Sequence, residues 1–177
     1  GFTLGANSLG GRGNETNLNG GSYVAWCWSA SDTTVVNNEG TIQSQVRSNG
    51  NFSIVSYSGD GVDGDVGHGL DNAPDMLILK CTNVESNWTV RHSGLTSDDY
   101  VVRLNLSMAE EVDTNVNGAL DDKTFVVKTG PSAGNQANRV GSNYIAYCWA
   151  NSPTQSFGSY TASGNNAVTV DCGFEPA

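Results

Sequence analysis

One stretch of the sequence spaces its oxygen-bearing side chains like a calcium-binding loop. From Asp113 onward, loop positions 1, 3, 5 and 9 carry oxygen ligands and position 6 is glycine, as in an EF-hand loop. These candidate ligands are Asp113, Asn115, Asn117 and Asp121. The twelfth position is Thr124, which cannot supply the bidentate carboxylate of such a loop. We therefore expect no tightly bound calcium here, and the alternative is a polar hairpin that turns at Asn-Gly.

A second acidic loop places carboxylates before a histidine. Asp60, Asp63 and Asp65 alternate with glycine, and Gly-His-Gly follows around His68. Such a loop could hold a hard cation, or His68 could bind a transition metal. We expect instead a glycine-rich hairpin with solvated carboxylates, in which His68 donates a hydrogen bond to a backbone carbonyl. His92 has no acidic or thiol partner beside it in the sequence and is expected to be structural.

The remaining carboxylates do not suggest a catalytic pair. They occur as adjacent doublets, whose side chains diverge on a strand, so none holds an acid and a nucleophile about 5 Å apart on one face. The doublets are Asp98–Asp99, Glu110–Glu111 and Asp121–Asp122. The sequence also lacks a His-Glu-x-x-His zinc motif and a P-loop. We expect no enzyme and no cofactor, with an acidic glycosidase as the alternative.

The charge balance argues against two classes of partner. The 177 residues carry a formal net charge of −10 with only 8 Lys and Arg. This excess of negative charge disfavours nucleic acid and an anionic membrane surface as partners. No run approaches about 18 apolar residues, so no membrane-spanning helix is expected. Four cysteines do not make a disulfide-dense scaffold, and they leave the redox compartment open.

Short β-branched and aromatic runs bounded by Gly, Asn, Asp or Pro predict an all-β chain. Strands are expected at residues 21–28, 33–36, 52–57, 76–80, 88–91, 100–106, 124–128, 143–149, 157–161 and 167–171. The only helical signal lies at residues 107–112, where Ser107 could cap and Glu110 occupies the capping-box position. The fold class predicted is an antiparallel β-sandwich.

The sequence repeats one unusual phrase. Residues 23–28, Tyr-Val-Ala-Trp-Cys-Trp, match residues 144–149, Tyr-Ile-Ala-Tyr-Cys-Trp, and residues 52–61 resemble residues 157–166. The phase of this repeat predicts three parts: the end of one unit at 1–30, a nearly complete central unit at 31–151 and the start of another at 152–177. The chain would then be a window onto a longer repetitive polypeptide. The alternative is one sandwich with pseudo-symmetric halves.

The repeated phrase is apolar on both faces, as in a strand in the middle of a sandwich. Cys27 and Cys148 are therefore expected to lie in equivalent central strands as small buried hydrophobic residues. A disulfide between them would need an unusually close approach of neighbouring units. Cys81–Cys172 is another conceivable pair, which the sequence does not specially support.

These phrases, taken in order, resemble a repeat module of phage tail and other virion structural proteins of marine phages. The matching segments are residues 1–28, 52–61, 67–70, 74–80, 88–92, 109–110 and 157–164. The resemblance covers nearly the whole chain and departs from the module at 39–50 and 112–123. It implies a concanavalin-A-like, jelly-roll type of β-sandwich and a place in a virion, and it implies no particular reaction.

We therefore expect a non-enzymatic structural or adhesive protein of a virion surface, such as a tail-fibre or decoration component. Its expected partners are further copies of itself, other virion proteins and host-surface glycans. The alternative is a carbohydrate-binding module in which Trp88 or Trp149 offers an exposed platform for a sugar ring.

The ends of the chain predict assembly. Residues 2–4 and 157–171 have strand character, but their pairing partners are not evident within one unit. Because unpaired strand edges readily pair with other chains, we expect these segments to pair with neighbouring units or subunits. The product would be a repetitive fibre or a cyclic oligomer such as a trimer.

Overall fold

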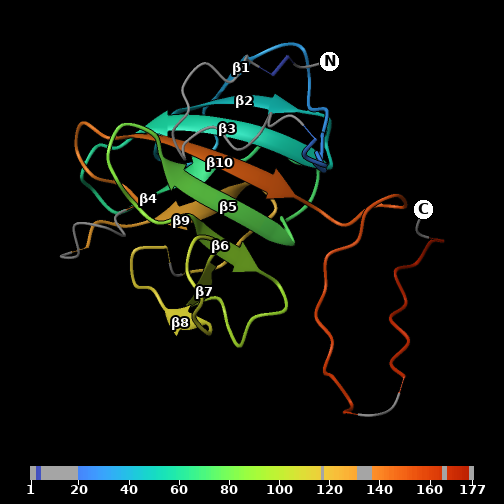
Figure 1. Ribbon diagram of the computed structural model, residues 1–177. Helices are drawn as coiled ribbons and strands as arrows, with labels where there is room; N and C mark the ends of the chain where they lie inside the picture. The colour runs from blue at the N-terminus through green and yellow to red at the C-terminus, as the bar shows by residue number, and fades with distance from the viewer. Residues whose placement is uncertain (1–2, 5–19, 117, 131–136, 165–166, 176–177) are drawn as a thin grey trace.

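The structure is a computed structural model, and it describes residues 3–4, 20–116, 118–130, 137–164 and 167–175 (Figure 1). These residues form β-strands and no helix. The strands are β1 (Val35–Asn37), β2 (Ser44–Ser48), β3 (Phe52–Ser58), β4 (Gly64–Gly67), β5 (Met76–Cys81), β6 (Thr89–His92), β7 (Tyr100–Arg103), β8 (Glu111–Val112), β9 (Thr124–Val127) and β10 (Asn143–Trp149). The all-β prediction is confirmed.

A large antiparallel sheet carries most of the strands, in the order β1-β2-β3-β10-β5-β6-β7-β8. The last strand along the chain, β10, lies in the middle of this sheet, between β3 and β5 (Figure 1). At one end of β10, Trp149 lies opposite Phe52 on one side and Met76 on the other. A strand with neighbours on both sides and apolar residues on both faces suits this position.

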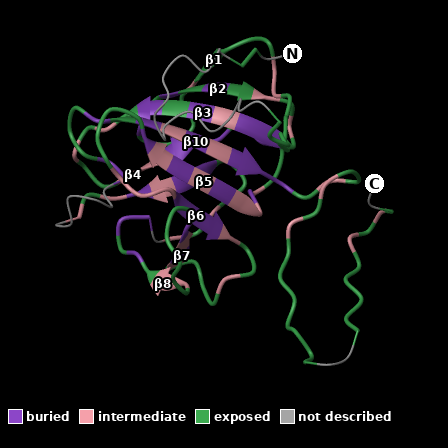
Figure 2. Ribbon diagram, viewed as in Figure 1, coloured by how far each residue is buried: buried purple, intermediate pink, exposed green. Residues whose placement is uncertain are grey.

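The second layer of the sandwich is the pair β4–β9, which packs across one face of the large sheet. A parallel bridge between Ile42 and Val66 joins the two layers. The core between them is made of buried residues, and buried residues are coloured purple along the ribbon in Figure 2. Its largest members include Val46, Val55, Val66, Leu77, Phe125, Val127 and Cys148.

Most of the predicted strands are present, and three further strands were missed. The structure confirms strands within 33–36, 52–57, 76–80, 88–91, 100–106, 124–128 and 143–149, with shifted ends in several cases. It adds β2, β4 and β8. These three strands are polar or very short, and their signals are weak because neighbouring strands, not local propensity, hold them in place.

The helix predicted at residues 107–112 is wrong. The Glu110 carboxylate accepts hydrogen bonds from the backbone and side chain of Thr96, and does not cap a helix at Ser107. The next residue, Glu111, pairs with Val101 in the β7–β8 ladder and accepts a hydrogen bond from Arg103. Contacts with distant residues therefore replace the local capping that the sequence suggested.

The strands predicted at 21–28, 157–161 and 167–171 are also wrong for this structure. These segments form no strand, and Figure 2 shows the chain after β10 largely exposed. Val24 and Trp26 are 77% and 76% exposed, so the expectation that Cys27 lies in a central strand equivalent to that of Cys148 fails here. The physical reason is that the position between β3 and β5, which this residue pattern fits, is filled by β10 of the same chain.

Candidate functional site

The loop that resembles a calcium site uses its oxygens for internal contacts. The carboxylate of Asp113 is buried; one oxygen lies 2.5 Å from Arg103 Nη2, and the other accepts two hydrogen bonds from Asn115. Asp121 accepts hydrogen bonds from the backbones of Lys123 and Thr124. The fourth candidate ligand, Asn117, lies outside the described residues. The two carboxylates of the loop thus serve a buried ion pair and a turn.

The carboxylates of the second acidic loop also accept hydrogen bonds from within the protein. Asp60 accepts a hydrogen bond from Asn138, Asp63 from Thr129, and Asp65 from Thr41. The hydrogen bonds from the Thr129 backbone and hydroxyl lower the pKa of the Asp63 carboxyl. In the part of the chain that the structure describes, no group of three or more His, Cys, Asp or Glu is placed to hold a metal ion.

His68, which directly follows β4, is fully buried. Its Nε2 lies 3.0 Å from the carbonyl oxygen of Asp121, and its Nδ1 accepts a hydrogen bond from the backbone of Leu70. The ring therefore donates to a backbone carbonyl, as expected, in its neutral form. Burial lowers the pKa of His68, and the hydrogen bond to Asp121 opposes this effect. The ring links β4 to the loop before β9 and has no free nitrogen for a metal.

One serine motif lies largely outside the described residues. Residues 130–134 read Gly-Pro-Ser-Ala-Gly, which matches the Gly-x-Ser-x-Gly pattern of a nucleophile elbow. Such an elbow joins a strand to a helix, so that the serine is raised at the start of the helix. Here residues 137–142 are not helical and lead directly into β10. The surroundings required for that motif are therefore not found after this segment.

The two tryptophans considered as a sugar platform have different surroundings. Trp149 is only 5% exposed, so its ring does not offer a platform in this structure. Trp88 is half-buried, and Lys80 Nζ lies 5.8 Å from the centre of its ring. The same ammonium donates to the backbone carbonyl of Ser86.

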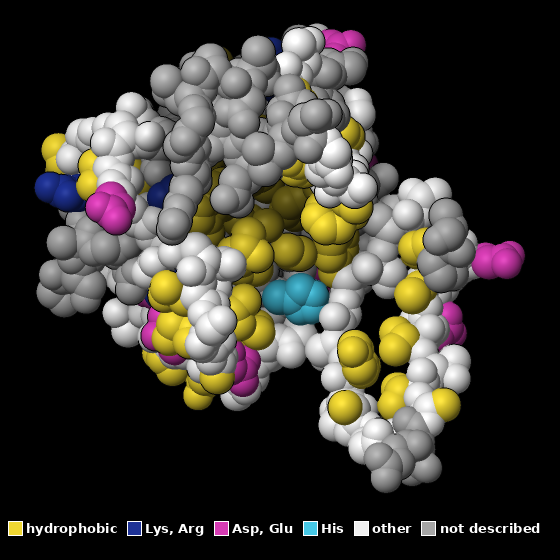
Figure 3. Space-filling model, in the orientation of Figure 1, with side chains coloured by type: hydrophobic (Ala, Val, Ile, Leu, Met, Phe, Trp, Pro, Cys, Tyr) yellow, Lys and Arg dark blue, Asp and Glu magenta, His cyan; other side chains and the backbone are white. Residues whose placement is uncertain are grey.

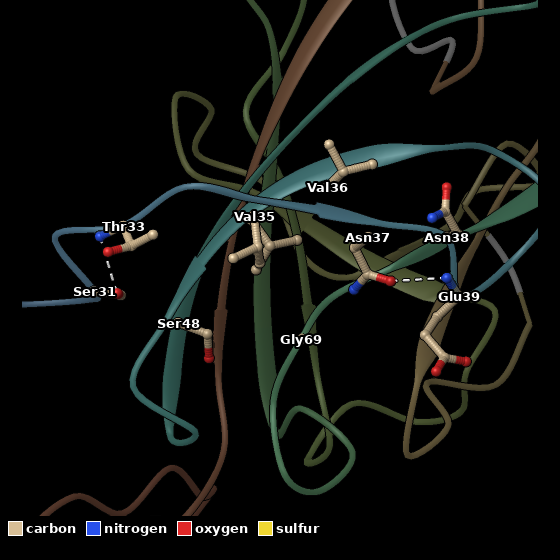
Figure 4. Close-up of a pocket in the computed structure, with 10 residues that line it drawn as sticks. Ser31, Thr33, Val35, Val36, Asn37, Asn38, Glu39, Ser48 and Gly69 are labelled. Carbon is tan, nitrogen blue, oxygen red and sulfur yellow. Dashed lines mark hydrogen bonds between the residues drawn. The ribbon is translucent and has the colours of Figure 1, made fainter.

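A shallow groove runs along edge strand β1 (Figure 4). Its volume is about 540 Å³, and its lining includes the side chains of Val35, Val36, Asn37 and Glu39. In Figure 4 the asparagine and serine side chains serve local turns: Asn37 accepts from the backbone of Glu39, and Ser31 from that of Thr33. Glu39 is the one ionisable residue among those that line the groove. The groove is therefore a feature of a sheet edge, and most of its side chains are apolar or engaged in local turns.

The most unusual arrangement of side chains is an aromatic cluster at the end of β10, which we call the aromatic corner. Its centre is Trp149, which stacks on Phe52 with ring centroids 5.1 Å apart. Trp28 packs edge-on against Trp149 at 5.6 Å, and Phe157 lies 6.0 Å from it. Tyr147 completes the cluster at 6.2 Å. Residues from before β1 and after β10 thus meet at the end of one central strand.

Hydrogen bonds fix both terminal segments near this corner. Asn49, between β2 and β3, donates to the carbonyl of Ser29 at 2.8 Å. Gln155 donates through Nε2 to the carbonyls of Asn51 and Ala150. Beyond these anchor points, residues 20–28 and the described residues of 157–175 enter no strand, and Figure 1 shows the C-terminal segment extending away from the sandwich. We call them the N-terminal arm (residues 20–28) and the C-terminal arm (residues 157–175).

The outer face of the large sheet is apolar next to the corner. Its side chains are half-buried Ile54 of β3, Ile145 and Tyr147 of β10, and Met76 and Ile78 of β5. Figure 3 shows a hydrophobic hollow in this region with a histidine side chain at its rim. Both arms also expose apolar side chains: Val24, Trp26, Tyr160 and Val170 are each more than half exposed.

The cysteines are divided between the buried core and the exposed arms. Cys81 and Cys148 are buried, Cys172 is partly exposed and Cys27 is exposed, and all are free thiols. Burial raises the pKa of Cys148 to about 12, so this thiol is unreactive. The expectation of a buried hydrophobic cysteine is thus confirmed for Cys148 and wrong for Cys27, and Cys81 and Cys172 are not bonded to each other.

The best candidate for a functional site is therefore the aromatic corner with its two arms. Sequence reasoning singled out the repeated phrase and the strand character of the ends, but not their meeting at Trp149. The signal for that meeting was the Cys-Trp pair at 27–28, which recurs at 148–149, together with the resemblance of the segment from Phe157 to the segment from Phe52, which lies opposite Trp149.

The chain belongs to the family described as Domain of unknown function (DUF7483), which it matches over residues 1–177. No curated protein and no solved structure matches it. No helix among the described residues is long and apolar enough to cross a bilayer.

Proposed function

We propose that this chain is a non-enzymatic structural unit of a virion surface, part of a tail fibre or a decoration protein, that assembles through its terminal arms. The observation that carries the proposal is the aromatic corner of a well-packed β-sandwich, together with the two arms beside it, which expose the apolar side chains of Val24, Trp26, Tyr160 and Val170. Exposed apolar surface of this kind is typical of protein–protein contacts. The resemblance of the ordered phrases to phage tail modules supplies the virion context.

The chemistry of the described residues supports a structural role. The carboxylates that resembled metal ligands accept hydrogen bonds from neighbouring N–H groups, and the buried histidine has both nitrogens engaged. A net charge of −10 keeps such a chain from sticking at random, so that contacts are left to the apolar arms. The proposed place of the protein is the extracellular surface of the particle.

The test is the mass of the full chain in solution as its concentration rises, measured by light scattering after gel filtration. We expect the wild type to associate reversibly and the double variant Val24→Ser, Trp26→Ser to stay at the monomer mass. Val62→Ser is the matched control, because Val62 is 65% exposed but lies on the sandwich. A wild type that remains monomeric, or an arm variant that associates equally well, contradicts the proposal.

Glycan binding by the same unit has Trp88 as its remaining aromatic candidate, because Trp149 is buried. Screening the protein against host-surface glycans tests this alternative. Glycan binding that is lost in Trp88→Ala and retained in the arm variant would favour a carbohydrate-binding module. Immunogold labelling of phage particles with antibodies against this chain tests the virion location separately.

A further inference from the structure

The N-terminal arm copies β10 at the positions that determine fit. In β10, Tyr144, Ala146 and Cys148 point into the core and are all buried. The arm has the same three residue types at the same spacing, as Tyr23, Ala25 and Cys27. On the other face, Val24, Trp26 and Trp28 replace Ile145, Tyr147 and Trp149 with side chains of similar size. The arm is therefore built to pair with a strand of the β3 type.

The C-terminal arm copies that partner. Residues 157–164 begin with Phe157 and end with Ser-Gly, as Phe52–Ser58 and the glycine that follows it do. Tyr160 occupies the place of buried Val55. One arm thus resembles β10 and the other resembles the strand that β10 pairs with.

We infer that residues 22–28 of one copy pair antiparallel with residues 157–163 of a second copy, in the register that β10 makes with β3. In that register Trp149 lies opposite Phe52 and Cys148 opposite Ser53. The equivalent pairs between copies are Trp28 opposite Phe157 and Cys27 opposite Gly158. This inference rests on the proposed function and adds the partner, the pairing and the register.

The partner is inferred to be another copy because the two arms of one chain form no strand pair in the described residues, although their roots meet at Trp149. The roots are anchored on the turn between β2 and β3, where Asn49 donates to the carbonyl of Ser29 and Gln155 donates to the carbonyl of Asn51. Beyond its root the C-terminal arm extends away from the sandwich, which leaves it accessible to a second copy (Figure 1).

A contact of this kind is head-to-tail, since the N-terminal arm of one copy meets the C-terminal arm of the next. Such heterologous contacts produce open chains when the rotation between copies does not close a ring. Each junction would gain main-chain hydrogen bonds across the two arms together with burial of Trp26 and Val24. Strand addition supplies affinity through the main chain and specificity through alternate side chains.

The register can be tested by disulfide cross-linking of the full chain. Gly158→Cys introduces a thiol opposite Cys27, at a position where an added Cβ meets nothing within 4 Å. The background is Cys172→Ser, while Cys81 and Cys148 are buried and stay in place. The matched control is Ser159→Cys, which points to the other face of the paired arms and is out of register by one residue. Both variants are oxidised by dissolved oxygen with copper-phenanthroline.

We expect Gly158→Cys to form a ladder of covalent dimers and longer chains, about tenfold more abundant than with Ser159→Cys, because directly opposed residues satisfy disulfide geometry. Equal cross-linking of both variants, or a bond within one chain seen as a faster-moving monomer, overturns the inference. Failure to cross-link in samples that associate by light scattering also overturns it, yet leaves the proposed function standing. Absence of association in that assay instead refutes the proposed function.

Discussion

Replacing Asp113 by asparagine should be the most destabilising conservative change in this protein. The side chains of Arg103 and Asp113 are 1% and 3% exposed, and the guanidinium also donates to Thr89 and Glu111. Asp113→Asn removes the buried negative charge. It also places the amide NH₂ group against a donor, which is either the Arg103 guanidinium or the N–H groups of Asn115. Leaving one charge of a buried pair uncompensated costs about 3–5 kcal/mol, which is a large part of the stability of a typical domain.

The matched control is Glu111→Gln, which removes the second carboxylate of the same arginine. The Glu111 side chain is 35% exposed, and its oxygen lies 2.9 Å from Arg103 Nε. Because water screens an exposed ion pair, we expect this variant to lose no more than about 1 kcal/mol. Arg103→Met combined with Asp113→Asn should recover part of the loss, since no charge is then left buried.

The assay is urea unfolding of each variant followed by tryptophan fluorescence, which gives the free energy of unfolding from the midpoint and slope. A variant Asp113→Asn that unfolds within about 1 kcal/mol of the wild type would refute the argument. Equal losses for Asp113→Asn and Glu111→Gln would also refute it, since the burial of the pair would then not determine the cost.

Three further predictions follow from the buried groups. Because burial lowers the pKa of His68, the contribution of this group to stability is complete above about pH 6.5. The free energy of unfolding should fall by up to about 1.4 kcal/mol per pH unit as the pH drops toward the lower folded-state pKa. Urea midpoints between pH 7.5 and 5.5 should show this decline, and His68→Gln should weaken it. Millimolar calcium should leave the urea midpoint unchanged, and a rise in that midpoint would show that an ion binds the folded protein. Trp149→Ala should cost about 3–5 kcal/mol while exposed Trp26→Ala changes stability by no more than about 0.5 kcal/mol, and similar losses for both would contradict the burial described for the corner.

The sequence was a good guide to strands that carry their own pattern. The segments 52–57, 76–80 and 143–149 are rich in apolar and aromatic side chains, and each pairs with neighbours on both sides. It was a poor guide to β2 and β4, which have one valine each and depend on β3 and β9 for their hydrogen bonds. Pairing across the sheet therefore determined what local residue types did not.

The error at residues 21–28 has a different cause. Its pattern matches β10, yet a strand with two apolar faces needs a neighbour on each edge and cover on each face. Those neighbours are strands β3 and β5 in the case of β10, and no equivalent pair is free in the described part of this chain. Residue types thus predicted what the segment can do and not where its partners lie.

The candidate site was predictable only in part. The repeated Cys-Trp phrase marked residues 28 and 149 as equivalent, but the packing of both rings together at the end of β10 depends on the paths of two loops. The Arg103–Asp113 pair likewise joins β7 to the loop after β8, and no local spacing indicates it. Sequence-distant contacts of this kind require the fold.

Hydrogen exchange of the backbone amides in the two arms, recorded at low and at high protein concentration, is the most direct measurement of the central claim. The account predicts rapid exchange in residues 22–28 and 157–163 of the monomer and marked protection of both segments as the protein associates, with alternate amides protected as in an antiparallel pair. Association that leaves these amides unprotected, while other surfaces become protected, would contradict it.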